Sequence, residues 1–432
     1  MKMSYPPGSE PPKTEERDGP AARCERPLRI GVFTDSYLPY LSGVVRVVET
    51  TSRELIRRGH QVIIFAPGYD RFRSGKTWSE RDDSGIQIIR FPSLPAPNYP
   101  GFRLPLPYQP GIGRRVRELG LDIIHSHTPF LLGGLAMSLA RRRGVPLVFT
   151  HHTLYHEYVH YAPVGRRLVR WWVWQHVARY CRQAALVIAP SHVVAAQVRD
   201  GYRVNTPVEV IPSGIDLDLF TSPQRDRGWL RREFAIPQEA RVLINVGRLT
   251  LEKNPRLLLA SFALLREGEK EQAASGRPVS PHYLVLVGDG PQRSALETEA
   301  RELGIGDRVI FCGRQPPERV ADALLGADLF LMASYTETQG LVVAEALAAG
   351  LPVVTVNSPQ LLETARDGQE AVVAAGTPAA FAAACQRVLE DAALYERLQR
   401  AALARAGDLS ISAATERLIS SYRNLLMKRG RV

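Results

Sequence analysis

The chain has 432 residues, 45% of them apolar and 23% charged, which is typical of a soluble globular protein and too long for a single compact core. No apolar run reaches the roughly 18 residues that cross a bilayer, and the first residues lack the apolar core of a signal peptide, so we expect a cytosolic protein. The four cysteines are scattered, which excludes a disulfide framework and a cysteine-based metal motif.

Positive charge is concentrated in the first half of the chain. Residues 1–210 hold 29 Lys and Arg against 17 Asp and Glu, whereas the remaining residues hold 26 against 27. This asymmetry predicts an anionic partner for the first half, either acidic lipid or nucleic acid. We expect no nucleic acid, because no recognisable binding module appears and the aromatic residues are not spread along strands as stacking platforms.

The chain begins with a polar segment, residues 1–27, which we expect to be a disordered tail. From residue 28, short apolar runs alternate with helical patterns, as in a parallel sheet covered by helices. The runs of this first series are LRIGVF, QVIIFAP, IQIIRF, LDIIHSH, PLVFTHH and ALVIAP. They predict one α/β domain over residues 28–212.

A second series of apolar runs follows turn residues near 210–220. Its members are RVLINVG, HYLVLVGDG, RVIFCG, LFLMAS and PVVTV. Two such series predict two doubly wound domains, the second over residues 213–410. Within it, residues 266–281 are polar and are expected to form a surface insertion.

Ligands of doubly wound sheets bind at the carboxyl ends of the strands, so the loops there are the candidate sites. The first such loop contains Asp35, Tyr37 and Gly43. A glycine before a helix lets backbone amides approach an anion closely. In the second domain, Arg248 and Lys253 follow a strand, and such cations can neutralise a diphosphate leaving group.

The segment TETQGLVVAEAL carries two acids, Glu337 and Glu345, eight positions apart. We interpret Glu337 as a loop residue, with Gly340 and Leu341 at the turn into a helix that carries Glu345 inward. Glu345 stands among apolar residues, where an unpaired charge is costly, so a ligand contact is favoured over a solvated acid. Acids beside free amides at a helix start can accept sugar hydroxyls while the amides bind a phosphate.

Two pairs of histidines follow predicted strands. The run LDIIHSH puts His125 and His127 on one face of a strand. His151 and His152 are adjacent in PLVFTHH, and because no acid or cysteine at a fitting spacing completes a site there, we expect no metal.

With these motifs in this order, the sequence from about Leu28 onward resembles the retaining nucleotide-sugar glycosyltransferases of the two-domain GT-B type, family four. The TETQGL variant looks most like the diacylglycerol glycosyltransferases. The resemblance implies two Rossmann-like domains facing each other across a cleft, a UDP-sugar as co-substrate, retention at the anomeric carbon and no metal cofactor. It also implies that residues 411–432 form a helix that crosses back to the first domain.

The resemblance also implies roles for individual residues. The cations would hold the diphosphate beside the Gly43 amide, Glu345 would accept the ribose hydroxyls, and the leaving phosphate itself would take the acceptor proton. The catalytic set is His127, Arg248, Lys253 and Glu337. The donor-binding set is Gly43, Gly247, Arg248, Lys253, Gly288, Asp289, Glu337, Gly340, Leu341 and Glu345. The acceptor or membrane set is Asp35, Tyr37, Tyr155, Tyr158, Arg166, Arg167, Arg170, Trp171 and Trp172.

Residues 165–182 contain five Arg and three Trp but no acid. This composition is typical of an interfacial helix, in which the rings lie at headgroup depth and the cations meet anionic lipid. The alternative is a buried helix whose tryptophans lie in the core while its arginines face water. Each basic residue near an anionic surface contributes about 1 kcal/mol, so a few of them can hold a protein reversibly at a membrane.

The sequence therefore predicts a transferase that moves glucose or galactose from a UDP-sugar to a lipid, 1,2-diacylglycerol, while bound peripherally to the cytosolic face of a membrane. The alternative is a transferase of the same fold that acts on a soluble or polyprenyl-linked glycan. A GT-B-like epimerase or a phosphorylase shares the architecture. The TETQGL pocket and the absence of a lysine positioned for pyridoxal phosphate disfavour the phosphorylase. A binding module without catalysis would lack the Arg, Lys and Glu set.

Overall fold

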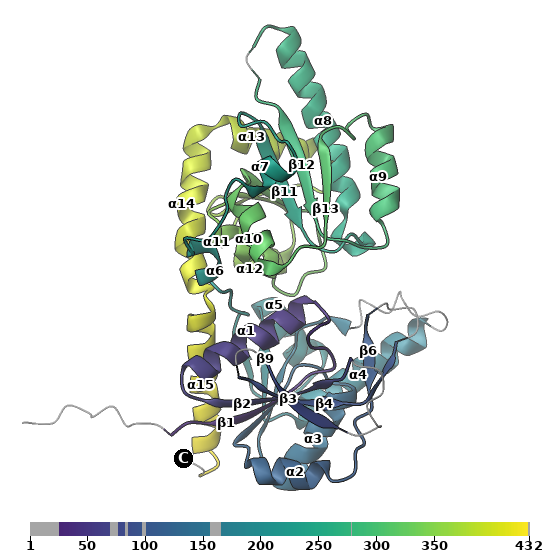
Figure 1. Cartoon of the computed structure of the whole chain (residues 1–432), viewed down its shortest axis with the longest axis vertical. Coiled ribbons are helices and arrows are strands. Elements are labelled where there is room, and N and C mark those ends of the chain that lie inside the picture. Colours follow the sequence, from purple (N-terminus) through teal and green to yellow (C-terminus); the bar gives the residue numbers. More distant parts are fainter. Residues whose placement is uncertain are drawn as a thin grey trace, which may run out of the picture.

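The computed structural model describes residues 26–69, 77–82, 85–96, 101–155, 166–277 and 279–430. Two α/β domains lie one above the other along the long axis of the molecule (Figure 1). Each domain is built on one predominantly parallel sheet with helices on both faces. This arrangement confirms the predicted pair of doubly wound domains.

The sheet of the first domain has the strand order β10-β9-β8-β7-β1-β2-β4-β3. Its strands are parallel except β3, which runs antiparallel to β4 at the edge. Strands β7, β8 and β9 are buried throughout, which explains their continuous apolar sequences. The bounds are β1 (Arg29–Phe33), β2 (Gln61–Pro67), β3 (Trp78–Arg81), β4 (Gln87–Phe91), β7 (Ile123–Ser126), β8 (Leu147–Thr150), β9 (Leu186–Ala189) and β10 (Val208–Val210).

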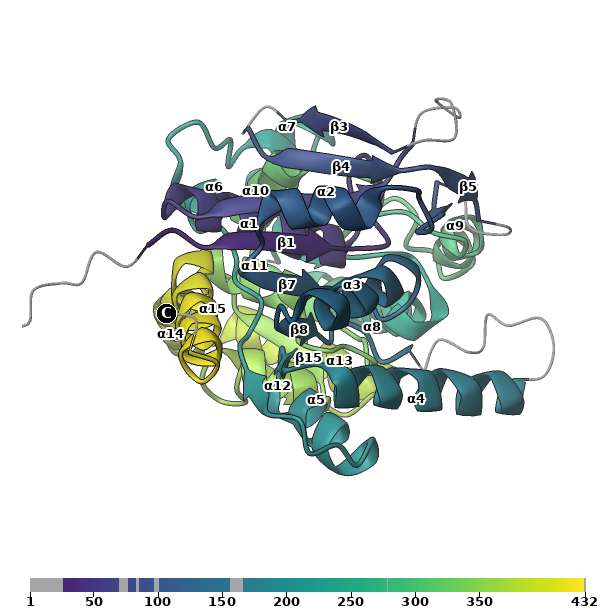
Figure 2. The same cartoon turned by 90° about the horizontal axis from the view of Figure 1, so that it is seen from below.

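Helices cover both faces of this sheet, and α4 projects beyond its edge (Figure 2). A separate two-stranded antiparallel ribbon, which the sequence analysis did not predict, follows β4. The helices are α1 (Gly43–Arg57), α2 (Ile112–Leu119), α3 (Leu131–Arg143), α4 (Arg166–Gln183) and α5 (His192–Ala196), continued by a π-helical turn at Gln197–Gly201; the ribbon is β5 (Ser93–Pro95) and β6 (Arg103–Pro105).

The sheet of the second domain has the order β13-β12-β11-β14-β15-β16, with every pairing parallel. Its strands are β11 (Arg241–Val246), β12 (His282–Val287), β13 (Val309–Gly313), β14 (Leu329–Met332), β15 (Val353–Val356) and β16 (Ala371–Ala374). Its helices are α6 (Asp218–Thr221), α7 (Trp229–Glu233), a 3-10 turn at Leu251–Lys253, α8 (Pro255–Ala274), α9 (Arg293–Glu302), α10 (Pro317–Leu325), α11 (Leu341–Ala348), α12 (Pro359–Thr364), α13 (Pro378–Glu390) and α14 (Ala392–Asp408).

The polar stretch 266–281, expected as a surface insertion, begins as helix, because α8 continues to Ala274 and projects from the top of the domain (Figure 1). Good helix formers such as Glu, Lys, Gln and Ala fill this part of the sequence. Its base is anchored by Glu269, a buried acid that accepts a hydrogen bond from the His282 backbone amide at 2.8 Å.

The last helix, α15 (Ile411–Met427), packs on the first domain although it follows α14 of the second (Figures 1 and 2). Leu418, Ile419 and Leu426 join the apolar core formed by β1, β2 and α1. The Tyr422 hydroxyl lies 2.6 Å from Nδ1 of His125, on the central strand β7. The C-terminal segment is thereby part of the core of the first domain.

The chain thus passes between the domains twice, and the two passages lie side by side. The Ile215 amide donates to the Leu409 carbonyl at 2.9 Å, and the Ile411 amide donates to the Ile215 carbonyl at 2.7 Å. Gly214 makes this approach possible, because a Cβ there would lie 2.4 Å from the Cα of Ile411.

Candidate active site

The first loop of the N-terminal domain faces the start of α11 in the C-terminal domain. Ser42 caps α1, since its hydroxyl accepts a hydrogen bond from the Val45 amide at 3.3 Å. At Gly43, the first residue of α1, a Cβ would stand 3.7 Å from Cδ1 of Leu341. The start of α1 and the start of α11 therefore meet at the domain interface, as expected for two sites that enclose one ligand.

Cations and acids of the predicted donor site come from two neighbouring loops of the second domain. The Lys253 ammonium, at the end of the 3-10 turn after β11, donates to a carboxylate oxygen of Glu337, in the loop after β14. Arg248 lies in the same loop as Lys253 and contacts Glu252 at 3.4 Å, with its guanidinium half-exposed. Of the catalytic set, the structure joins Lys253 to Glu337, 84 positions away, and places Arg248 in the same loop as Lys253.

Gly340 sets the direction of α11. Its φ of +80° is in the left-handed region that favours glycine, and a Cβ would lie only 2.5 Å from Cδ2 of Leu361. Helix α11 begins at the next residue, Leu341, and carries Glu345 into the interior, where that residue is 5% exposed. Glu337 thus stays on the loop while Glu345 points inward, the arrangement predicted from the sequence.

The Glu345 carboxylate is engaged from the opposite domain. Nη1 of Arg46, in the first turn of α1, lies 2.7 Å from Oε1 of Glu345. Among the residues that the structure describes, no group hydrogen-bonds the buried Oε2. Burial raises the pKa of the Glu345 carboxyl, and the charge of Arg46 opposes that rise.

The two loops after β11 and β12 pack backbone against backbone. Gly288 has a φ of +141°, and a Cβ there would lie 1.8 Å from the Gly247 carbonyl oxygen. The Leu249 amide donates to the Asp289 carbonyl at 3.1 Å. Gly247, Gly288 and Asp289 thus form the framework that presents Arg248 and Lys253.

The predicted active-site histidine belongs to a buried cluster at the carboxyl ends of β7 and β8. His125 lies on β7 and His127 follows its last residue, with their ring centroids 4.3 Å apart. Nδ1 of His127 lies 2.7 Å from Nε2 of His152, and Nε2 of His125 lies 2.7 Å from the Thr150 hydroxyl. Burial lowers the pKa of His125 and of His152 to about 3 and that of His127 well below its ordinary value, so these rings are neutral at pH 7.

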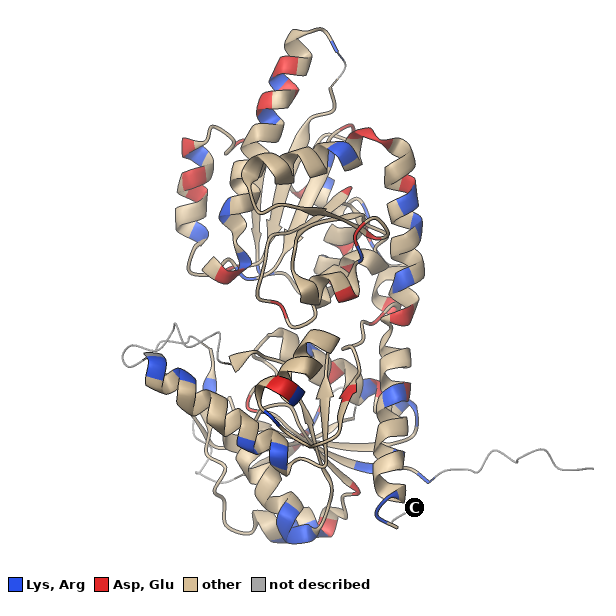
Figure 3. Cartoon of the chain, turned by 180° about the vertical axis from the view of Figure 1, so that it is seen from behind, with Lys and Arg blue, Asp and Glu red and all other residues tan. Residues whose placement is uncertain are grey.

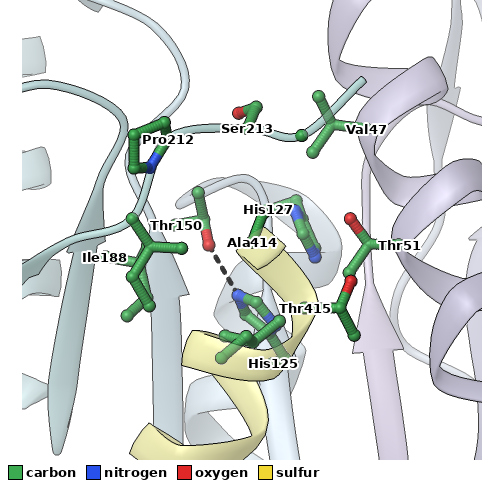
Figure 4. Close-up of a pocket in the computed structure, with 13 residues that line it drawn as sticks. Val47, Thr51, His125, His127, Thr150, Ile188, Pro212, Ser213, Ala414 and Thr415 are labelled. Carbon is green, nitrogen blue, oxygen red and sulfur yellow. Dashed lines mark hydrogen bonds between the residues drawn. The ribbon is translucent and has the colours of Figure 1, made fainter. Parts of the chain in front are cut away.

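The cluster opens onto a small cavity (Figure 4). His127 and His125 form one side, α1 contributes Val47 and Thr51, and Thr415 of α15 points in from below. The cavity also borders the passage between the domains, and its remaining lining residues are Thr150, Ile188, Ile211, Pro212, Ser213, Gly214, Ala414 and Leu418.

Two residues that we expected on the acceptor side are buried in structural contacts. Oδ1 of Asp35 accepts a hydrogen bond from the Leu132 amide at 2.7 Å and so caps the start of α3. Burial raises the pKa of Asp35 to about 6. Tyr37 is fully buried, with the Arg90 guanidinium 5.6 Å from the centre of its ring.

Of the two tyrosines predicted in the acceptor segment, only Tyr155 lies within the described residues. The Tyr155 ring is partly buried and packs edge-on against Phe130, with ring centroids 5.1 Å apart. Tyr158 lies outside the described residues.

Helix α4 combines the two alternatives considered for residues 165–182. Trp174 packs inward on Tyr202, with ring centroids 4.6 Å apart. Leu168, Trp171 and Trp172 point outward, with 69%, 60% and 53% of their surface exposed. Arg167 and Arg170 are exposed on the same outer part of the helix, and Figure 3 shows positive residues without acids along α4; the side chain of Arg166 lies outside the described residues.

Three residues that link the second domain to the first domain or to the passage between them were missed in the sequence. Gln339 holds both the amide and the carbonyl of Ser213, at 2.7 and 3.0 Å. Glu363 accepts from the amides of His192 and Val193 at the start of α5, at 2.6 and 2.9 Å. Arg46 is the third. A signal existed only for Gln339, which lies within the TETQGL motif.

The paired domains, with facing helix starts and clustered cations and acids, are the architecture of nucleotide-sugar transferases. The family model "Glycosyltransferase Family 4" matches residues 41–219, and "Glycosyl transferases group 1" matches residues 226–405. The chain belongs to glycosyltransferase family 4 and is a hexosyltransferase with the GT-B fold.

Two curated relatives carry the name alpha-monoglucosyldiacylglycerol synthase. The chain is 35% identical to that of Streptococcus pneumoniae over 338 residues, 77% of this chain and 72% of the relative. It is 31% identical to that of Acholeplasma laidlawii over 347 residues, 76% of this chain and 80% of the relative. The D-inositol 3-phosphate glycosyltransferase of Corynebacterium diphtheriae is 29% identical over 394 residues, 87% of this chain and 88% of the relative.

Solved structures share the fold. Sucrose-phosphate synthase of Thermosynechococcus elongatus superposes with a TM-score of 0.71 at 21% identity, over 93% of this chain and all of that one. Anabaena HepE in complex with UDP-glucose has a TM-score of 0.70 at 20% identity, over 92% of this chain and all of that one. Within the described ranges, no helix is long and apolar enough to cross a membrane.

Proposed function

We propose that the protein transfers a glucosyl or galactosyl unit from a UDP-sugar to a lipid hydroxyl, that of 1,2-diacylglycerol, with retention at the anomeric carbon. The observation that carries the proposal is the joining of Lys253 to Glu337 beside the start of α11, with Glu345 one helix turn deeper. Cations, acids and helix-start amides are the groups that a sugar diphosphate requires. The names of the two relatives above support diacylglycerol as acceptor.

In this proposal each donor group meets one part of the UDP-sugar. Arg248 and Lys253 hold the diphosphate and stabilise the charge that grows on it as the glycosidic bond breaks. Glu345 accepts ribose hydroxyls, and Glu337 accepts hydroxyls of the transferred sugar. The diphosphate would draw the Lys253 ammonium away from Glu337, because the phosphate oxygens and the Glu337 carboxylate compete for this one cation. No metal takes part in the proposed reaction.

His127 acts from the opposite domain as a neutral hydrogen-bonding group. Its Nδ1 is held by His152, which fixes the ring while the other nitrogen can face the sugar. The acceptor oxygen forms the new bond at the anomeric carbon as the bond to the β-phosphate breaks. The leaving phosphate takes the proton of the acceptor hydroxyl, so no side chain is assigned as nucleophile.

We further propose that the first domain binds the cytosolic face of an anionic membrane through α4. Exposed tryptophans are unusual on a surface unless they contact a partner, and here they stand beside arginines on a helix that projects from the domain. The rings would lie at headgroup depth while the arginines pair with lipid phosphates. In this proposal the acceptor segment at Tyr155, which precedes α4 in the chain, would lie near the lipid.

A transfer assay tests the proposal. Radiolabelled UDP-glucose and UDP-galactose are offered with diacylglycerol in mixed vesicles, with and without anionic lipid. We expect labelled glycolipid from one donor, in an amount that rises with anionic lipid. Donor binding without a lipid product would overturn the lipid acceptor and favour a soluble or polyprenyl-linked one, for which inositol phosphate is the first to offer because of the third relative.

A further inference from the structure

An ion pair crosses the interface between the two domains. Arg46 on α1 meets Oε1 of Glu345 on α11 at 2.7 Å, and the two side chains are 30% and 6% exposed. The pair leaves Oε2 of the same carboxylate buried and without a hydrogen-bond partner among the described residues. A buried oxygen of this kind is costly unless a ligand supplies the missing hydrogen bond.

Arg46 is held in place by its helix. Its amide donates to the Ser42 carbonyl at 3.0 Å in the first turn of α1, and its carbonyl accepts from the Thr50 hydroxyl at 2.8 Å. At the other end of α1, Arg58 donates to the carbonyl and hydroxyl of Ser412, both at 2.8 Å. Since Ser412 directly follows the second passage between the domains, α1 is braced against a segment that leads out of the donor domain.

The arginine decides which hydrogen bonds Glu345 can make. An ionised carboxylate only accepts, whereas a protonated one also donates. Burial favours the protonated form, and Arg46 is the group whose charge opposes it. A second possibility is that Arg46 blocks the site and must leave before the donor binds. The geometry speaks against it, because Arg46 occupies Oε1 and leaves the hydrogen-bonding capacity of Oε2 unused.

We propose that Arg46 is a positioning residue for the donor: by pairing with Oε1 it fixes the orientation of the Glu345 carboxylate, so that Oε2 accepts a ribose hydroxyl of the nucleotide. The inference rests on the proposed function, in which Glu345 binds the ribose. It goes beyond it by making the nucleotide site depend on the opposite domain. The nucleotide site is then complete only when the two domains are together.

The test measures UDP binding by calorimetry to the full chain carrying Arg46→Met. We expect the Kd for UDP to rise about tenfold, as is typical when a group that orients a ligand-binding side chain is lost. Arg46→Lys should restore part of the affinity. Arg53→Met is the matched control, because Arg53 lies on the same helix but pairs within that helix, with Glu49 at 2.8 Å; it should leave the Kd unchanged. Thermal melts confirm that each variant is folded.

Two further measurements distinguish a role of Arg46 in positioning Glu345 from a general effect of the substitution on the protein. The Arg46→Met penalty should disappear for 2′,3′-dideoxyuridine diphosphate, which lacks both ribose hydroxyls. In a double-mutant cycle, Arg46→Met should add little to Glu345→Gln. Unchanged or tighter UDP binding by Arg46→Met, while Glu345→Gln binds more weakly, would overturn the inference and leave the donor site standing. Unchanged binding by Glu345→Gln would instead overturn the proposed donor site, and the inference with it.

Discussion

Lys253 and Glu337 are hydrogen-bonded to each other, so the loop after β11 is joined to the loop after β14 at the start of α11. When no UDP-sugar is bound, each side chain supplies the hydrogen-bond partner and the opposite charge that the other needs. The proposed reaction needs both of them apart, the cation on the diphosphate and the acid on the sugar.

Lys253→Ala and Glu337→Ala should therefore each lower the rate of sugar transfer by at least about a hundredfold, the usual cost of losing a group that stabilises developing charge. The two side chains are only 22% and 13% exposed and each variant loses one partner of the pair, so thermal melts must show that both variants are folded. Initial rates with saturating UDP-sugar measure the effect, with Lys270→Ala, an exposed residue of α8, as the control. Full activity in either variant would refute the proposed donor site.

Gly340→Ala should destabilise the protein by about 2 kcal/mol and abolish activity, because a side chain there adopts a strained backbone and overlaps Leu361. The start of α11, with its free amides, would shift. Gly134→Ala is the control: it lies within α3 with nothing within 4 Å of its Cβ position, so it should be neutral or slightly stabilising. Urea denaturation gives the free energy of unfolding of both variants. If Gly340→Ala is as stable as Gly134→Ala, the predicted backbone strain at residue 340 is wrong.

Asp35 should make stability fall as the pH rises from about 4 to about 6. Its pKa in the folded protein is about 6, above its ordinary value of 3.8, so the folded state binds more protons in this window. A difference of about two pKa units corresponds to about 3 kcal/mol. Asp35→Asn keeps the acceptor for the Leu132 amide and should lose this dependence. Urea midpoints of the two proteins from pH 4 to 8 give the comparison, and parallel curves would argue against a raised pKa.

Replacing Arg166, Arg167 and Arg170 by Gln should weaken binding to anionic vesicles and make the remaining binding less sensitive to salt, since exposed charges are screened within about 10 Å at 0.1 M salt. Trp171→Ala with Trp172→Ala should weaken binding at every salt concentration. The control removes the same number of charges from exposed positions of the donor domain, Arg301, Arg397 and Arg400. Vesicle sedimentation that does not distinguish the two triple variants would exclude α4 as the membrane contact.

Transfer activity should be unaffected by chelators, because Arg248 and Lys253 supply the positive charge for the diphosphate. The measurement is the initial rate after dialysis against EDTA, with and without added Mg²⁺. A rate that falls on dialysis and returns with the ion would show that the two cations are insufficient.

Much of the fold could be predicted because buried parallel strands are continuous apolar runs. The strands around Ile124 and Leu286 are of this kind, and the turn before α11 was readable from Gly340 and the apolar residues that follow it. The edge strand β3 and the ribbon β5–β6 were missed because their residues alternate or are too few to form a pattern.

The site was predictable where a motif fixes the local backbone and not where contact depends on tertiary packing. Arg46 is one of several arginines in the first half, and nothing in its neighbours indicates that it reaches Glu345, 299 positions away. Asp35 and Tyr37 follow a strand in the same way as ligand-binding residues do, yet the first caps a helix and the second fills the core. Position in a loop does not reveal which way a side chain turns.

The paired passages between the domains define how the molecule can move. A single connection would act as a swivel, free to twist, whereas the two connections are hydrogen-bonded to each other at Ile215 and Ile411. We therefore expect the donor domain to swing toward and away from the first domain rather than to rotate sideways over it. Such a motion would bring α11 back to α1 in the same register.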